Sequence, residues 1–427
     1  MPHRRRPFAV TLAGLVAAVS VCVPIGAGAA TACPSLGPML QTCTVGQVVG
    51  DPALATIGIS GLAVSRFDSE STGEQIAWAA GDRSANERAG IDQVFLFGLD
   101  ARDGSLAIRY PLEPAAFQDD PVETSTDSIT KLGQTSNPIP DIEDLSIDYI
   151  DGGPGWVWLF DTGDNGGARG NLDAYVVREP DLATEPASAT ATIGAGLAVP
   201  GSGRVTPSPP PSPSGASGPS FLTSDPELDE ALTGPTLPVV RYPIRLMQGG
   251  IQVTSNVEAA FVDSNAPAGG PAPIYLISKS AVDGDGARTD FRFFRFATRN
   301  TAASGLTNDA VYVGTVSFAQ ADLKVTAASI LDDGSAFVVR AVNGGGQRPD
   351  VDVVGLWQRT SGTTIENEIA DRPNPDCRWS LNSAPASSSE ETIALDLTDA
   401  TSTGFEGFVW THDVRGVAPY FTAPRTG

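Results

Sequence analysis

A six-residue pattern that recurs along the chain constrains its fold more than any other feature. The pattern is E-x-Ø-x-Ø-D, where Ø is apolar, and residues 143–148, 258–263 and 391–396 match it. Residues 60–65 and 326–331 keep the apolar spacing but begin with a hydroxyl residue. Such alternation is typical of a β-strand. A second apolar run follows each match, at residues 75–80, 156–160, 274–278, 336–340 and 407–411. This long-period recurrence predicts a repeat architecture.

Four strands are expected in each of the first four units, which begin near residues 56, 140, 252 and 324. The fourth strand of the second unit is either 187–193 or 237–244, and that of the fourth unit is 363–368. The fifth unit, from residue 390, has only three strands, so residues 42–49 are expected to supply its outer strand. We therefore predict an all-β protein: a β-propeller of five four-stranded blades, closed by the N-terminal strand. Six blades are the alternative, with one blade merged across residues 119–137.

The ends of the chain and one insertion set its domain organisation. Residues 1–32 have the three arginines, apolar core and small-residue end of a secretory signal, which predicts an exported protein. Attachment to lipid at Cys33 is the alternative. Residues 33–427 then form a single domain, expected to be monomeric and without a membrane span. Its insertion at about 184–236 contains PSPPPSPSGASGPS, a composition that cannot bury a core.

Charge and cysteine content narrow the partners and the environment. The net charge is −23, and removing a signal with three arginines and no acid leaves −26. This charge argues against nucleic acid and anionic membranes and favours cations. Three cysteines remain, and one disulfide is expected in an oxidising compartment. Cys43 pairs with Cys33 or with Cys377, and we favour Cys377 because that bond would lock the closure of the propeller.

Ionisable residues should gather at one end of the propeller channel. The start of each first strand and the end of each second strand lie at the same end of an antiparallel pair. The predicted ligand-binding residues are Glu143, Asp144, Glu258, Lys279, Arg340, Glu391 and His412. Oxygen ligands in a glycine-containing loop beside them predict a Ca²⁺ site made by Asp161, Asp164, Asn165 and Glu143. The alternative is that Lys279 and Arg340 only neutralise Glu258 and its neighbours.

Two functions suit such a set of residues. The first is a secreted binding or scaffold protein that holds a small-molecule or cell-envelope ligand at this acidic, calcium-binding end. The second is an extracellular hydrolase of glycosides or phosphoesters that uses the same carboxylates. The sequence argues against a Ser-His-Asp hydrolase, because His412 is the only histidine after the signal and G-x-S-x-G does not occur. Whether the protein is an enzyme stays open.

Several segments resemble one family. DIEDLSID with FDTGDNGGARGNLDAYVVREPD resembles the D-x-E-D-[IL]-A, G-D-x-G-D-N and Y-x-x-x-E-P signature of secreted actinobacterial β-propeller proteins of uncharacterised function. NVEAAFVD with IYLISKS, and VTAASILDDGSAFVVRA, are similar to two further segments of that group. The group is loosely akin to phytase-like and WD40-like propellers. The resemblance implies export and a propeller fold, and it implies no reaction. The chain departs from the family at Asp332 and after Arg340.

Overall fold

The computed structural model consists almost entirely of β-strands. It describes residues 35–36, 40–45, 59–69, 74–81, 94–101, 104, 106–113, 142–149, 155–163, 169–180, 234–265, 271–280, 288–331, 333–343, 351–380, 394–396, 407–411 and 418–426. For 35–36, 40–45, 66–69, 74, 81 and everything from 394 onward, only the backbone is described. Within these ranges the helices are α5 (Ile365–Asp371) and a single 3₁₀ turn. The predicted all-β class is confirmed.

The strands form antiparallel sheets in chain order. The first sheet is β3 (Ile59–Ser69), β4 (Glu74–Gly81), β5 (Phe95–Asp100) and β6 (Leu106–Pro111). Next come β7 (Ile142–Asp148), β8 (Trp156–Asp161), β9 (Leu172–Arg178) and β10 (Val240–Gln248). The third set is β12 (Val257–Val262), β13 (Ile274–Ser278), β14 (Thr289–Phe296) and β15 (Asn308–Phe318), and the fourth is β16 (Leu323–Ile330), β17 (Ala336–Asn343), β18 (Asp352–Gln358) and β19 (Cys377–Ser380). The last is β20 (Ala394–Asp396), β21 (Gly407–Thr411) and β22 (Ala418–Thr426), joined by β1 (Ser35–Leu36) and β2 (Leu40–Val45).

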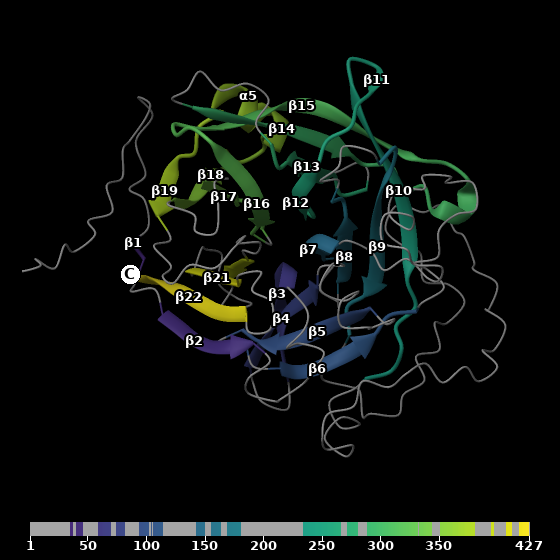
Figure 1. The fold of residues 1–427 in the computed structure, drawn as a ribbon, viewed down its shortest axis with the longest axis vertical. Helices are drawn as coiled ribbons and strands as arrows, with labels where there is room; N and C mark the ends of the chain where they lie inside the picture. The colour runs from purple at the N-terminus through teal and green to yellow at the C-terminus, as the bar shows by residue number, and fades with distance from the viewer. Residues whose placement is uncertain are drawn as a thin grey trace, which may run out of the picture.

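The first strand of each set lies at the centre of the molecule. Strand β3 contacts β7, β7 contacts β12, β12 contacts β16, and β20 contacts both β16 and β3. Figure 1 shows the later strands of each set extending outward from these inner strands. Antiparallel sheets arranged radially around inner strands are the architecture of a β-propeller.

Strand β10 resolves the choice left open in the second unit. Val240–Ile244 pair antiparallel with β9, so the strand after the insertion, and not 187–193, completes this sheet. The same strand pairs in parallel with β15, so the eight strands of the second and third sets, with the short β11 (Ile251–Gln252) paired to β10, form one nine-stranded sheet. Just before β10, Leu237 forms a parallel bridge with Leu112 beside β6. The segment therefore links three successive sets of strands at the outside of the molecule.

The predicted strand over 363–368 is wrong, because residues 365–368 form the first turn of helix α5 and residues 363–364 directly precede it. Thr364 caps the helix by accepting a hydrogen bond from the backbone N–H of Asn367. The carboxylates of Glu366 and Glu368, in the first turn, interact favourably with the positive end of the helix dipole. Ile365 and Ile369, four residues apart, are both buried. The edge strand of this sheet is β19 instead. None of the helices in the described ranges is long and apolar enough to cross a membrane.

Among the described side chains, three apolar clusters lie between neighbouring sets of strands. Trp78 belongs to the cluster between the first and second sets, Trp158 to the next, and Trp357 to the one between the third and fourth sets. All three indoles are fully buried. Burial of such large aromatic rings supplies much of the energy that holds successive sheets together.

Glu179 adds a polar connection between the first and second sets. Its carboxylate accepts hydrogen bonds from Ser65 Oγ at 2.6 Å and Trp78 Nε1 at 3.0 Å, both in the first set. It also accepts one from the backbone N–H of Gly155 at 2.7 Å. The glutamate of the Y-x-x-x-E-P segment therefore has a structural role here.

Candidate binding site at the bulged end of the inner strands

Four inner strands carry a β-bulge near their first residues. In each, the register with the next strand advances two residues on the inner strand for one on its neighbour. The extra residues are Ser60, Glu143, Glu258 and Thr326, the four that begin the recurring sequence pattern. A bulge redirects a side chain and is common beside functional sites. We call this end of the inner strands the bulged end.

Glu258 is held there by two neighbours. Its Oε1 accepts hydrogen bonds from Lys279 Nζ and from Asn256 Nδ2, each at 2.6 Å. The side chain of Glu258 is 2% exposed and that of Lys279 is 19% exposed, so this ion pair reaches the edge of solvent. The pairing is the one expected if Lys279 neutralises Glu258. Nearby in the fold, Thr326 is buried and its Oγ1 has no hydrogen-bond partner among the described residues.

Asp144 is fully buried and joins three inner strands. Its Oδ2 accepts hydrogen bonds from the backbone N–H of Ala260 in β12 at 2.9 Å and of Ala328 in β16 at 3.1 Å. Its Oδ1 accepts one from the N–H of Leu145 at 2.9 Å. Burial raises the pKa of Asp144 well above its usual value, although the three N–H groups favour the anion. These contacts give the side chain a structural role at the centre of the molecule.

Gly61 lets β3 approach β7 at the same level. A Cβ atom at Gly61 would overlap the Leu145 side chain and come within 2.9 Å of the backbone of Asp144 and Leu145. Beside it, Ser60 Oγ donates a hydrogen bond to the Ile142 carbonyl. Protein atoms therefore fill the space between these two strands next to the bulges.

Strand β8 of the second set ends in a cluster of acids and arginines. Asp161 accepts a hydrogen bond from Arg169 Nη1 at 2.6 Å, and its cross-strand neighbour Asp173 pairs with Arg241 at 2.8 Å. Burial raises the pKa of Asp173 to about 6, against the opposing effect of Arg241. Sequence reasoning missed Arg169, Asp173 and Arg241, because their importance depends on strand pairing. Of the predicted calcium ligands, Asp164 and Asn165 lie outside the described residues.

Arg340 pairs with an acid on the neighbouring strand of its own sheet. Its side chain is fully buried and forms two hydrogen bonds with Asp352 of β18, at 3.0 and 2.8 Å. The structure thus brings Lys279, but not Arg340, to Glu258. Glu391 and His412 lie outside the described residues. In the ranges that the structure describes, no group of three or more His, Cys, Asp or Glu side chains is placed to hold a metal ion.

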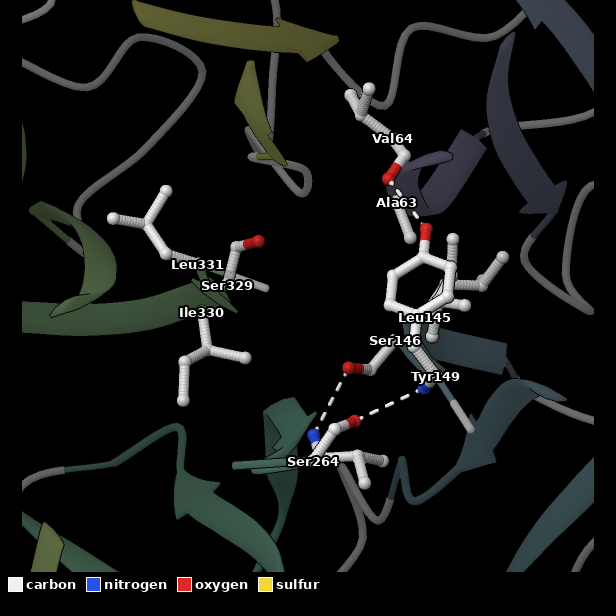
Figure 2. Close-up of a pocket in the computed structure, with 11 residues that line it drawn as sticks. Ala63, Val64, Leu145, Ser146, Tyr149, Ser264, Ser329, Ile330 and Leu331 are labelled. Carbon is white, nitrogen blue, oxygen red and sulfur yellow. Dashed lines mark hydrogen bonds between the residues drawn. The ribbon is translucent and has the colours of Figure 1, made fainter. Parts of the chain in front are cut away.

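A small cavity lies near the other end of the inner strands (Figure 2). It is lined by Ala63, Val64, Leu145, Ser146, Ile147, Tyr149, Val262, Ser264, Ser329, Ile330 and Leu331. Ser146 Oγ accepts a hydrogen bond from the Val262 N–H at 3.0 Å, and Ser264 Oγ accepts one from the Tyr149 N–H at 3.2 Å. The cavity measures about 20 Å³, which is room for about one water molecule. It is therefore too small for an organic ligand as it stands.

Comparisons with known proteins add little to these observations. No protein-family model matches the chain, and no curated protein is similar to it in sequence. Among solved structures, the β-propeller domain of Myceliophteria thermophila Cps50 (Swd1) is 9% identical, with a TM-score of 0.28, and the alignment covers 85% of this chain and 83% of that one. The extracellular domains 1–2 of Drosophila Semaphorin 1b are 8% identical, with a TM-score of 0.29 and 86% and 63% covered. Scores this low carry no weight, so the fold assignment rests on the strands themselves.

Proposed function

We propose that the protein is an exported β-propeller binding protein whose ligand site is the bulged end of the inner strands. The observation that carries this proposal is the bulge shared by four inner strands at Ser60, Glu143, Glu258 and Thr326. A β-bulge interrupts regular strand pairing. Because the bulge recurs in four inner strands, we expect it to serve a binding site as well as the fold. The ligand is polar or cationic, because the residues that begin these strands are two acids and two hydroxyls.

Calcium is the cation that we propose for this end. The net charge of −26 after signal removal and the carboxylate of Glu143 support it. Of the described acids at this end, Glu258 pairs with Lys279, Asp161 pairs with Arg169, and Asp144 accepts hydrogen bonds from backbone N–H groups. We propose that Glu143 binds the calcium ion together with Asp161, Asp164 and Asn165.

The closure of the propeller and its export belong to the same proposal. Strand β2 pairs antiparallel with β22 from Leu40–Thr422 to Val45–Ala418. This pairing supports a five-bladed propeller in which the N-terminal strand completes the last blade. The apolar leader with its three arginines supports export.

Thermal unfolding of the chain that begins at Cys33 tests the calcium site. Melting is measured in chelator and in increasing calcium, with Glu143→Gln beside the wild type. We expect calcium to raise the Tm of the wild type, by an amount equivalent to about 2.7 kcal/mol at one hundred times the Kd. Glu143→Gln should lose the shift. Asp309→Asn, the same charge change at an exposed carboxylate paired with Arg245 on the outer strands, should keep it. An unchanged wild-type Tm at millimolar calcium would reject the calcium site.

An extracellular hydrolase is the second candidate, and one observation favours it. Asp161 and Asp173 face each other across β8 and β9, and the pKa of Asp173 is raised to about 6. A carboxyl that titrates near neutrality beside a second carboxylate suits acid–base hydrolysis. Aryl glycosides and aryl phosphates, offered with and without calcium, test it. Turnover that Asp173→Asn abolishes would establish an enzyme, and no turnover of any substrate favours the binding protein.

A further inference from the structure

Arg299 is a buried cation without an ion-pair partner. The residue is 5% exposed and lies beyond the end of β14. Its Nη1 donates a hydrogen bond to the Thr298 carbonyl at 3.2 Å and its Nη2 donates one to the Ala272 carbonyl. No carboxylate in the described ranges forms a salt bridge with it. Two carbonyls satisfy N–H groups but supply no full negative charge, and a buried charge without a close counter-ion is strongly unfavourable.

Two further buried hydrogen-bond donors lie beside Arg299, and the described residues supply no acceptor for them or for Arg299 Nε. The guanidinium carbon lies 4.8 Å from the centre of the Trp158 ring, which is 5.1 Å from the ring of Tyr242. Arg299 Nε, Trp158 Nε1 and Tyr242 Oη are all buried and have no hydrogen-bond partner within the described part of the chain. Buried donors in native proteins almost always have an acceptor, so three in one contact cluster indicate a missing one.

The neighbouring groups do not account for this cluster. Stacking over Trp158 and near Phe296 lowers the cost of burying the guanidinium, but it uses the ring faces and supplies no acceptor for the Nε N–H group. Asp148 attracts Arg299 electrostatically, yet its Oδ1 accepts a hydrogen bond from Ser264 Oγ at 2.9 Å and it forms no salt bridge with Arg299. A negatively charged acceptor would supply both the missing hydrogen-bond acceptor and a close counter-charge for Arg299.

We propose that a small monovalent anion of the chloride class binds between the second and third sets of strands, against Arg299, Trp158 and Tyr242. One guanidinium supplies one positive charge, which matches a monovalent ion. Trp158 and Tyr242 are both fully buried, so we propose a single-atom ion, which needs the least room. Such an ion would join β8 and β10 to the end of β14 and stabilise the packing between neighbouring sheets.

Halide-dependent stability tests the anion site separately from the calcium site. Unfolding is followed in chelator at constant ionic strength while gluconate replaces chloride. Above the Kd, each tenfold rise in chloride should raise the folding equilibrium constant about tenfold. Arg299→Gln should abolish this dependence. Arg178→Gln is the matched control, because Arg178 also stacks on a tryptophan, Trp156, at 5.3 Å. It should retain the dependence.

A second variant and a direct measurement cover the case in which Arg299→Gln does not fold. Tyr242→Phe removes one unpaired hydroxyl without changing the packed volume, and it should weaken the chloride dependence. Crystals grown in bromide should show an anomalous peak beside Arg299. Stability that is independent of halide, or an ordered water alone at that position in bromide, would overturn the proposal.

Discussion

Replacing Asp144 with Asn is the sharpest test of how the centre of the molecule is held. The carboxylate accepts hydrogen bonds from the backbone N–H groups of Leu145, Ala260 and Ala328. An amide has one acceptor oxygen. If that oxygen keeps Ala260 and Ala328, the amide NH₂ must face the N–H of Leu145, and neither donor has an acceptor. Each buried unsatisfied group costs about 1–3 kcal/mol. Relief from burying a charged group offsets part of this, so we expect a loss of about 2–4 kcal/mol.

Urea unfolding of Asp144→Asn and the wild type gives the change in free energy. Asp322→Asn is the control, because Asp322 is exposed and has a φ of 58°, which Asn also tolerates. It should change stability by less than about 0.5 kcal/mol. If Asp144→Asn costs no more than Asp322→Asn, then the three hydrogen bonds do not hold the inner strands together, and the structural role assigned to Asp144 is wrong.

The pH dependence of the same variant provides an independent check. Burial raises the pKa of folded Asp144 above its reference value of 3.8. The folded state therefore binds the proton more tightly, and the wild type loses stability as pH rises from about 4 through the folded pKa. Asp144→Asn cannot titrate. The difference in unfolding free energy between the two proteins should be largest in acid and should shrink as pH rises, and a difference that grows with pH would contradict this account.

Three further predictions follow from named contacts. Gly61→Ala should destabilise the protein by about 1–3 kcal/mol in urea unfolding, because the added Cβ would meet Leu145 and its backbone. The pKa of about 6 at Asp173 implies that the wild type loses stability between about pH 4 and 6 relative to Asp173→Asn, and identical pH profiles would refute it. Cys377 is disulfide-bonded, and peptide mapping of the unreduced mature protein should join it to Cys43 and not to Cys33.

The recurring pattern was readable from sequence because it is local. Alternation of apolar residues locates a strand without knowledge of its neighbours. The same alignment singled out Ser60, Glu143, Glu258 and Thr326, which are the extra residues of the four bulges. The acidic composition could likewise be read directly. The bulges themselves were not predictable, since a bulge is a property of two paired strands.

The partners of each charged side chain were decided only by tertiary structure. Arg340 is the last residue of one predicted second strand, and Lys279 directly follows another. Lys279 pairs with Glu258, whereas Arg340 pairs with Asp352 because β18 places that acid beside it. In the sequence, Asp144 is one of several acids at the predicted channel end. In the fold, β12 and β16 lie close enough for their backbone N–H groups to donate hydrogen bonds to its buried carboxylate. Arg299 carried no sequence signal at all. Alternation determines which face of a strand a residue occupies, whereas its contacts depend on strand pairing and sheet packing, which bring Arg340 to Asp352, 12 positions away, and Asp144 to Ala260, 116 positions away.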